Sequence, residues 1–215
     1  MSIKTYFKSG IEFDEQRDKV WKHICKYLQN YISPLNSILD LGAGHCNFIN
    51  NIESNNKYAV DLFNDLKKYA SCDVKCYISK CFKLNFIKSH SIDVVFSSNL
   101  FEHLEDDEID KTLKDILRIL KDNGKLILMQ PNFRYCYKNY FDDYTHIKVF
   151  TDESLQRLLK LYGFNITKCM PKFLPYSIKN KASKLSCLIP LYLKSPIKPF
   201  AGQMLMIGEK IIKWI

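Results

Sequence analysis

Two histidines in this 215-residue chain stand among acidic and polar residues, in surroundings that suit proton transfer. His103 follows an apolar run and lies next to Glu102, and His146 follows a pair of aspartates in a stretch that reads as a loop. The ordinary pKa of histidine lies close to neutrality, so its ring can accept a proton from a hydroxyl and release it again. Either residue could act as a general base. Alternatively, His103 supports the start of a helix and His146 is a solvated loop residue.

A glycine turn directly after a short apolar run forms a second candidate site. In SILDLGAGHCNFIN (37–50), Gly42 and Gly44 end the run, but Asn47 replaces the third glycine of a dinucleotide-binding motif. Asp61 could accept both hydroxyls of a ribose, and Asp40 could reach a cationic amino group. A ligand with a ribose, an ammonium group and no phosphate fits these residues, and S-adenosylmethionine is such a ligand. The alternative is that Asp40 caps a helix and the glycines form only a tight turn.

Hydrophobic periodicity places both sites on alternating strands and helices. Strands are expected at 37–41, 57–61, 74–78, 91–99, 125–131, 164–170 and 202–210, and helices at 13–32, 46–54, 65–70, 106–121 and 152–164. Asn123-Gly124 is expected to end the fourth helix, and a proline-containing insertion occupies about 171–200. This alternation favours a parallel sheet with helices on both faces, in which ligands bind at the carboxyl ends of the strands.

Charge and composition narrow the classes of partner and compartment. The net charge is +9, and residues 161–215 hold nine lysines and a single acid, Glu209. This imbalance suggests an anionic partner, such as a phosphate, a nucleotide-linked substrate or a membrane surface, although a lysine-rich composition alone would also produce it. The eight cysteines are scattered without a CxxC pair, so we expect free thiols in a reducing cytosol. The first residues, MSIKTYFKSG, lack the apolar core of a signal peptide, and a cytoplasmic location is expected.

The order of short motifs along the chain resembles that of class I SAM-dependent methyltransferases. These motifs are DLGAG (40–44), VDL (60–62), IDVVFSSN (92–99), EHL (102–104) and RILKDNGKLIL (118–128). Further motifs are similar to those of a bacterial group associated with polysaccharide biosynthesis: SNLFEHL (98–104), MQPNFRY (129–135), YTHI (144–147), TDESL (151–155), KFLPYS (172–177) and AGQML (201–205). The resemblance implies an α/β fold, a Rossmann-like doubly wound seven-stranded sheet with an antiparallel last strand. It also implies one domain over 1–215, with an N-terminal helix at 13–32 and the 171–200 insertion on the substrate side.

The resemblance further implies which residues meet the cofactor S-adenosylmethionine and the acceptor. The cofactor is expected against Asp40, Gly42, Ala43, Gly44, Asp61, Leu62, Ser79, Asn99 and Leu100. The acceptor is expected against Gln130, Asn132, Arg134 and Tyr144, with Arg134 able to grip a phosphate through two bonds. His146 and His103 are the expected catalytic residues.

Several positions depart from the family pattern. Cys46 replaces a small residue after the glycines, Ser79 stands near the position of an acid that meets the adenine, and Thr145 and Ile147 replace an aspartate and a second histidine. Related ubiquinone O-methyltransferases hold a divalent metal with two acids and a histidine at the EHL motif. Asn99 takes the place of the first of those acids, so no metal is expected here.

The expected activity is methyl transfer from S-adenosylmethionine to a hydroxyl of a saccharide, or of a nucleotide- or phosphate-linked sugar, in surface polysaccharide biosynthesis. Two alternatives stay open: methylation of another small phosphate-containing metabolite, and a SAM-binding scaffold without activity. No nucleic-acid partner is expected, because the chain has no recognised RNA-binding module. The basic C-terminal part could contact a membrane surface, and the 171–200 insertion could be a lid, a membrane contact or an ordinary packed segment.

Overall fold

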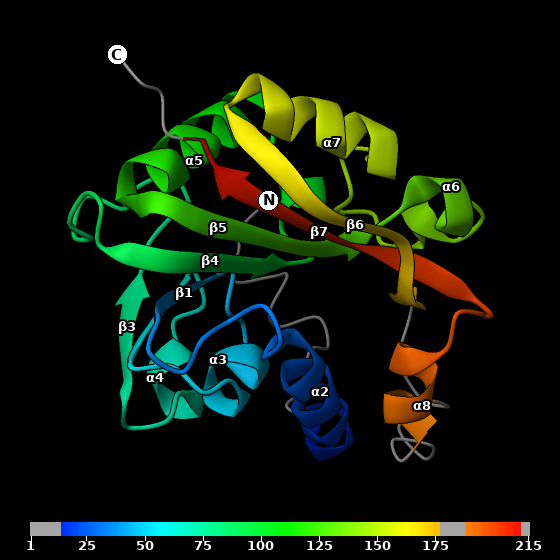
Figure 1. Cartoon of the computed structure of the whole chain (residues 1–215), viewed down its shortest axis with the longest axis horizontal. Helices are drawn as coiled ribbons and strands as arrows, with labels where there is room; N and C mark the ends of the chain where they lie inside the picture. Colours follow the sequence, from blue (N-terminus) through cyan, green and yellow to red (C-terminus); the bar gives the residue numbers. More distant parts are fainter. Residues whose placement is uncertain (1–13, 177–187, 212–215) are drawn as a thin grey trace.

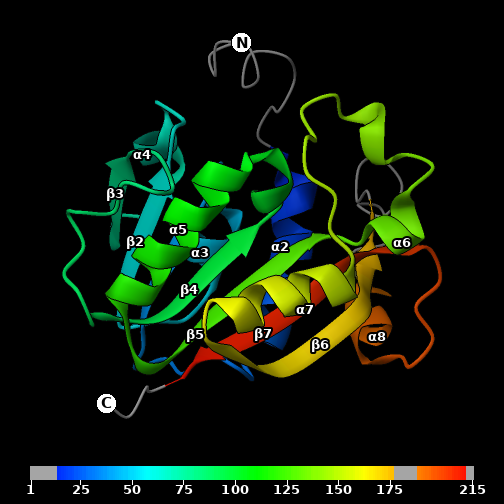
Figure 2. The same cartoon turned by 90° about the horizontal axis from the view of Figure 1, so that it is seen from above.

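A seven-stranded sheet runs through the centre of the molecule (Figures 1 and 2). The structure is a computed structural model that describes residues 14–176 and 188–211. The strands are β1 (Ser37–Leu41), β2 (Asn56–Asp61), β3 (Val74–Ile78), β4 (Ile92–Ser98), β5 (Leu120–Pro131), β6 (Phe164–Pro175) and β7 (Ala201–Lys210). Their order is β3-β2-β1-β4-β5-β7-β6, and β7 is antiparallel to both of its neighbours. The predicted Rossmann-like sheet with an antiparallel last strand is therefore confirmed.

Helices cover both faces of the sheet, and each face has its own apolar core. On one face lie α2 (Glu15–Leu28), α3 (Asn47–Asn51), α4 (Leu66–Tyr69) and α8 (Ile189–Lys194), and on the other lie α5 (Asp106–Ile119) and α7 (Asp152–Leu161) (Figure 1). Phe48 of α3 stacks on Phe96 of β4 with the ring centroids 3.7 Å apart, which fixes α3, directly after the glycine turn, against the sheet. On the other face, Leu113 and Ile116 of α5 are fully buried in the second core.

Three short helical segments connect the strands near their carboxyl ends. They are η1 (Phe101–His103), α6 (Phe133–Cys136) and η2 (Tyr140–Asp142). The chain passes from η1 into α5 through a capping box, in which Glu105 and Glu108 bond each other's backbone N–H groups. This cap fixes the start of α5 at Asp106, directly after the EHL motif and Glu105.

Several element boundaries differ from those predicted. The N-terminal helix begins at Glu15 and ends at Leu28, within the predicted 13–32. The prediction that Asn123-Gly124 ends a helix is wrong: α5 already stops at Ile119, because Leu120 is buried in the sheet beside Ile92. Asn123 instead adopts a φ of 59° inside β5, where the register with β4 shifts.

The predicted insertion is partly regular structure. Strand β6 continues to Pro175, and the residues from 189 to 194 form α8, which packs against α2. Residues 177–187 lie outside the described residues. The predicted start of the insertion at 171 is therefore too early, because β6 stays paired with β7 as far as Pro175 and Ala201.

All described cysteines are free thiols, namely Cys25, Cys46, Cys72, Cys76, Cys81, Cys136 and Cys169. No helix in 14–176 or 188–211 is both long enough and apolar enough to span a membrane.

Candidate active site

A cavity of about 510 Å³ opens at the carboxyl ends of β1, β2, β3 and β4. All the residues predicted to meet the cofactor line it: Asp40, Gly42, Ala43, Gly44, Asp61, Leu62, Ser79, Asn99 and Leu100. His103 also lines this cavity. The topology of parallel strands thus brings residues that are far apart in the sequence to one edge of the sheet.

The glycine turn forms the floor of this cavity. Gly42 and Gly44 have φ values of 80° and 52°, which favour glycine. The backbone N–H of Gly44 donates to Oδ2 of Asp61 over 2.7 Å, and that of Phe63 donates to Oδ1 over 2.9 Å. A Cβ on Gly42 would approach the Leu100 side chain to 3.3 Å. Both glycines are therefore needed where the chain turns beneath Asp61.

Asp40 does not cap a helix, so that alternative is wrong. The residue before α3 is Cys46, which makes no side-chain cap bond. Asp40 is buried at the cavity wall, and burial, followed by the charge of Asp61, raises the pKa of its carboxyl well above the ordinary value. Burial also raises the pKa of Asp61, although the backbone N–H groups of Gly44 and Phe63 oppose this shift. A cationic group bound between the two acids would relieve their repulsion, which suits the ammonium group expected of the ligand.

Ser79 lines the cavity at the end of β3, where the family pattern has an acid near the adenine. Its hydroxyl donates to the carbonyl of Lys83 over 3.0 Å. Because the hydrogen is used in this bond, Ser79 Oγ can offer an acceptor to an amino group of the ligand but not a donor. Phe82 lines the same side of the cavity and supplies an aromatic wall.

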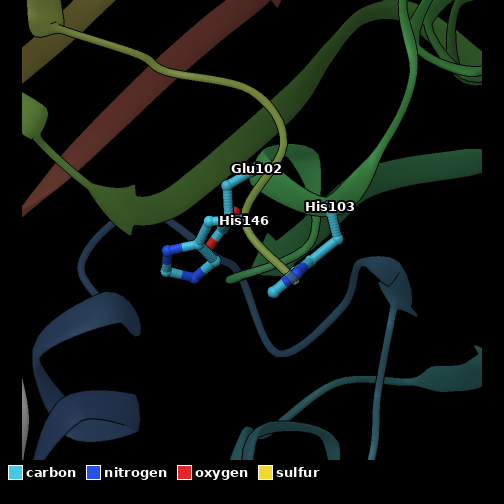
Figure 3. A group of neighbouring side chains, drawn as sticks. All are labelled: Glu102, His103 and His146. Carbon is cyan, nitrogen blue, oxygen red and sulfur yellow. The ribbon is translucent and has the colours of Figure 1, made fainter. Parts of the chain in front are cut away.

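Glu102, His103 and His146 form a cluster next to this cavity (Figure 3). Glu102 and His103 belong to η1, and the loop after η2 brings His146 to them, with the two imidazole centroids 4.9 Å apart. The backbone N–H groups of Ile147 and Lys148 both donate to the carbonyl of Glu102 over 3.0 Å. These two bonds fix the loop against η1 and so hold the two histidines together.

Burial controls the charge of this cluster. It raises the pKa of Glu102 to about 8, and the charge of Asp143 adds to the effect. Burial lowers the pKa of His103 below its ordinary value, and the neighbouring His146 lowers it further, although the carbonyl of Thr145 opposes this. At neutral pH the His103 ring is therefore neutral and able to accept a proton.

The four predicted acceptor residues do not line the cavity. Gln130 is buried in β5, and its Nε2 has no hydrogen-bond partner among the described residues. Asn132 is fully buried and donates to Asp152 and to the carbonyl of Pro171. The guanidinium of Arg134 pairs with Glu153 over 3.0 Å, and Tyr144 is exposed. The structure thus gives Asn132 a role in holding the fold, and an acceptor contact by any of these residues stays a prediction.

Several cavity residues were not among the predicted site residues. Arg17 and Trp21 of α2, His45 after the glycine turn and Phe82 all line it. Arg17 and Trp21 are four residues apart, so they share one face of α2, but nothing in the periodicity shows that this face turns to the glycine turn. His45 lies inside the motif itself and packs edge-on against Phe63 and Tyr69.

Comparisons with known proteins identify the family and the fold of the chain. Residues 13–168 match the family model described as "methyltransferase domain". No curated protein matches the sequence. Among solved structures, a SAM-dependent methyltransferase from Archaeoglobus fulgidus superposes with a TM-score of 0.69 at 20% identity, covering 97% of this chain and all of its own.

Two other solved structures show the same fold. A protein from Pyrococcus horikoshii has a TM-score of 0.69 at 17% identity, covering 97% of this chain and all of its own. A SAM-dependent methyltransferase from Methanosarcina mazei has a TM-score of 0.65 at 15% identity, covering 87% of this chain and 98% of its own. The family match covers most of the chain, and the cavity has an acid pair and a glycine turn suited to a sulfonium nucleoside. The chain therefore belongs to the methyltransferase domain family and uses S-adenosylmethionine as its methyl donor.

Proposed function

We propose that this methyltransferase acts on a hydroxyl of a saccharide that carries a phosphate or a nucleotide. The observation that carries the proposal is the position of His103, whose ring lines the same cavity as the glycine turn and Asp61. Its lowered pKa keeps it neutral at physiological pH. A neutral imidazole beside a methyl-donor site suits an acceptor that must lose a proton, as a hydroxyl must.

Different residues of the chain would bind the methyl donor, exclude water and accept the hydroxyl proton. Bound S-adenosylmethionine supplies a methyl group on a positively charged sulfur, which leaves as a neutral thioether. The glycine turn and Asp61 hold the donor in one place, and Leu62, Leu100 and Leu104 give the cavity apolar walls that exclude water. His103 takes the hydroxyl proton as the acceptor oxygen gains the methyl group.

The segment that follows β5 supports a sugar acceptor. This segment, 133–150, reaches the cavity lining at Thr145, and the aromatic rings of Tyr137, Phe141 and Tyr144 are exposed along it. Aromatic rings present an apolar face on which a sugar ring can pack. Lys172 lies over the ring of Tyr135, 4.6 Å from its centroid, and adds positive charge to the same segment. These features favour an anionic saccharide over an uncharged apolar acceptor.

The test is a methyl-transfer screen with the full chain over nucleotide sugars, sugar phosphates, free sugars and phosphate-containing metabolites that are not sugars. We expect turnover with a phosphate-linked sugar, and at least ~10-fold lower kcat for His103→Ala and His146→Ala with unchanged S-adenosylmethionine binding. His90→Ala, at an exposed histidine far along the sheet from the cavity, is the control. Because the acting base must be neutral, kcat should fall as the pH drops through the lowered pKa of His103.

Three results would contradict this proposal. Binding of S-adenosylmethionine without turnover on any acceptor would favour the non-catalytic scaffold. Turnover only on the metabolites that are not sugars would favour the alternative small-molecule substrate. Normal kcat in His103→Ala would remove that ring as the base.

A further inference from the structure

The side chains of Glu102, His103 and His146 bring three metal-binding donor atoms together (Figure 3). Each offers one ligand atom, and these atoms all lie within 4.8 Å of one another. Two come from adjacent residues of η1 and the third from a separate loop, so the arrangement depends on the fold and not on a local sequence motif. Within 14–176 and 188–211, no other group of histidine, cysteine and acidic side chains is gathered in this way.

The two imidazole rings are held by their Nδ1 atoms. Nδ1 of His146 lies 2.7 Å from the carbonyl oxygen of Tyr140, and Nδ1 of His103 lies 3.1 Å from that of Thr145. Since a carbonyl oxygen can only accept, each Nδ1 carries the hydrogen and the lone pair resides on Nε2. Histidines that bind metals are commonly held in this way, with the second ring nitrogen donating to a backbone carbonyl.

Glu102 provides an independent observation. Its side chain is only 1% exposed, and neither carboxyl oxygen has a hydrogen-bond partner among the described residues. A buried carboxyl group without any partner is costly, and such groups in native proteins are usually satisfied by another group or by an ion. Here a cation that is also bound by the two imidazoles would give the Glu102 carboxylate the partner it lacks.

We propose that Glu102, His103 and His146 bind one divalent transition metal, with Zn²⁺ as the best fit to two imidazoles and one carboxylate. Three protein ligands leave one coordination position of a tetrahedral metal open. This position would lie beside the cavity, because His103 lines the cavity. The donor atoms would have to close to about 3.4 Å from one another, the spacing of a tetrahedral zinc site with bonds of about 2.1 Å. The absence of an acid at Asn99 does not exclude the site, because His146 supplies the third ligand.

The inference goes beyond the proposed function, because metal binding needs neither the methyl donor nor the acceptor. It also changes how the site would act: a bound metal would lower the pKa of a coordinated acceptor hydroxyl, in place of direct proton removal by His103. Replacement of His103 lowers turnover in either case. Only a direct measurement of metal binding distinguishes proton removal by His103 from activation of the hydroxyl by a bound metal.

The experiment is a Co²⁺ titration of the metal-stripped full chain, followed by optical absorption and by competition with Zn²⁺. We expect one equivalent of Co²⁺ with visible d–d bands, no thiolate-to-cobalt charge-transfer band, and displacement by Zn²⁺. Glu102→Gln and His146→Asn should each weaken binding at least ~10-fold. His90→Asn makes the matched substitution at an exposed histidine and should bind as the original chain does.

The proposal is overturned if the original chain binds no Co²⁺, if the spectrum shows thiolate ligands, or if Glu102→Gln and His146→Asn both bind normally. Far-UV circular dichroism identifies a variant that has lost its fold, and the remaining variant and the spectrum of the original chain then decide. S-adenosylmethionine binding and methyl transfer are measured separately on the same preparations. A loss of those activities with metal binding intact would count against the proposed function alone.

Discussion

Asp61 accepts two backbone hydrogen bonds and also faces the cavity, so one side chain shapes the turn and meets the ligand. In Asp61→Asn, one of the two oxygens becomes an NH₂ group, which cannot accept from the N–H of Gly44 or Phe63. It also removes the charge that would accept ribose hydroxyls. We expect S-adenosylmethionine to bind at least ~10-fold more weakly, since hydrogen bonds to a charged group contribute about 1.5–3 kcal/mol. Isothermal titration calorimetry measures this directly.

Asp65→Asn is the matched control for this prediction. Asp65 lies in the same segment at the start of α4, is exposed, and makes no side-chain cap bond. Its replacement should leave the affinity unchanged. Equal affinities for Asp61→Asn and the original chain would show that the glycine turn holds something other than the ribose of the methyl donor.

The residues of the cofactor cavity were predictable because a short local pattern carries them. Gly42 and Gly44 follow a buried strand, and Asp61 ends the neighbouring strand, so strand pairing alone places the three together. The position of Arg17, Trp21 and Glu102 was not predictable in the same way. Their roles depend on how a helix or a turn is rotated against the sheet, and the spacing of apolar residues does not fix that rotation.

At the scale of elements, β6 is longer than its sequence pattern indicates because it gains its order from β7. Residues beyond 170 include two prolines and no clean alternation, yet the strand stays paired as far as Pro175. The end of this pairing depends on Gly202 in β7, where an added Cβ would lie 2.5 Å from Cβ of Tyr176. The hydrophobic periodicity of 171–175 does not indicate this extension, because these residues are held in the sheet by β7, a strand that comes later in the chain.

Gly202→Ala is therefore expected to separate the ends of β6 and β7. The clash involves atoms close to both backbones, which cannot rotate away, so the free energy of unfolding should fall by about 1–3 kcal/mol. Gly208→Ala is the matched comparison, because its added Cβ would meet Cβ of Phe164 at 3.1 Å, a tighter contact than usual but without the same overlap. Urea unfolding of both variants should show the larger loss for Gly202→Ala. A larger loss for Gly208→Ala would contradict the role given to Gly202 at the end of the β6–β7 pairing.

At the scale of the whole molecule, positive charge and exposed apolar side chains meet in the C-terminal part. The first 160 residues are nearly balanced in charge, whereas the last 55 carry the excess of lysines. In the same part, Leu191 of α8 (69%) and Phe200, just before β7 (91%), are exposed, with Lys194 between them in the sequence. Basic residues beside exposed apolar side chains are typical of surfaces that contact anionic membranes.

We expect the full chain to co-sediment with vesicles of anionic phospholipid and not with neutral vesicles, and to be released by high salt, which screens charge. Leu191→Ser should reduce binding by about tenfold, because it removes an apolar side chain worth roughly 1.5–3 kcal/mol when buried. Leu161→Ser is the matched control: Leu161 is 84% exposed on α7, which covers the opposite face of the sheet from α8 (Figure 1). Equal binding by the two variants would mean that charge alone draws the chain to the vesicles. If the original chain does not bind the vesicles, the membrane contact is wrong. The lysines would then be available to attract a soluble anionic acceptor, such as the proposed sugar phosphate.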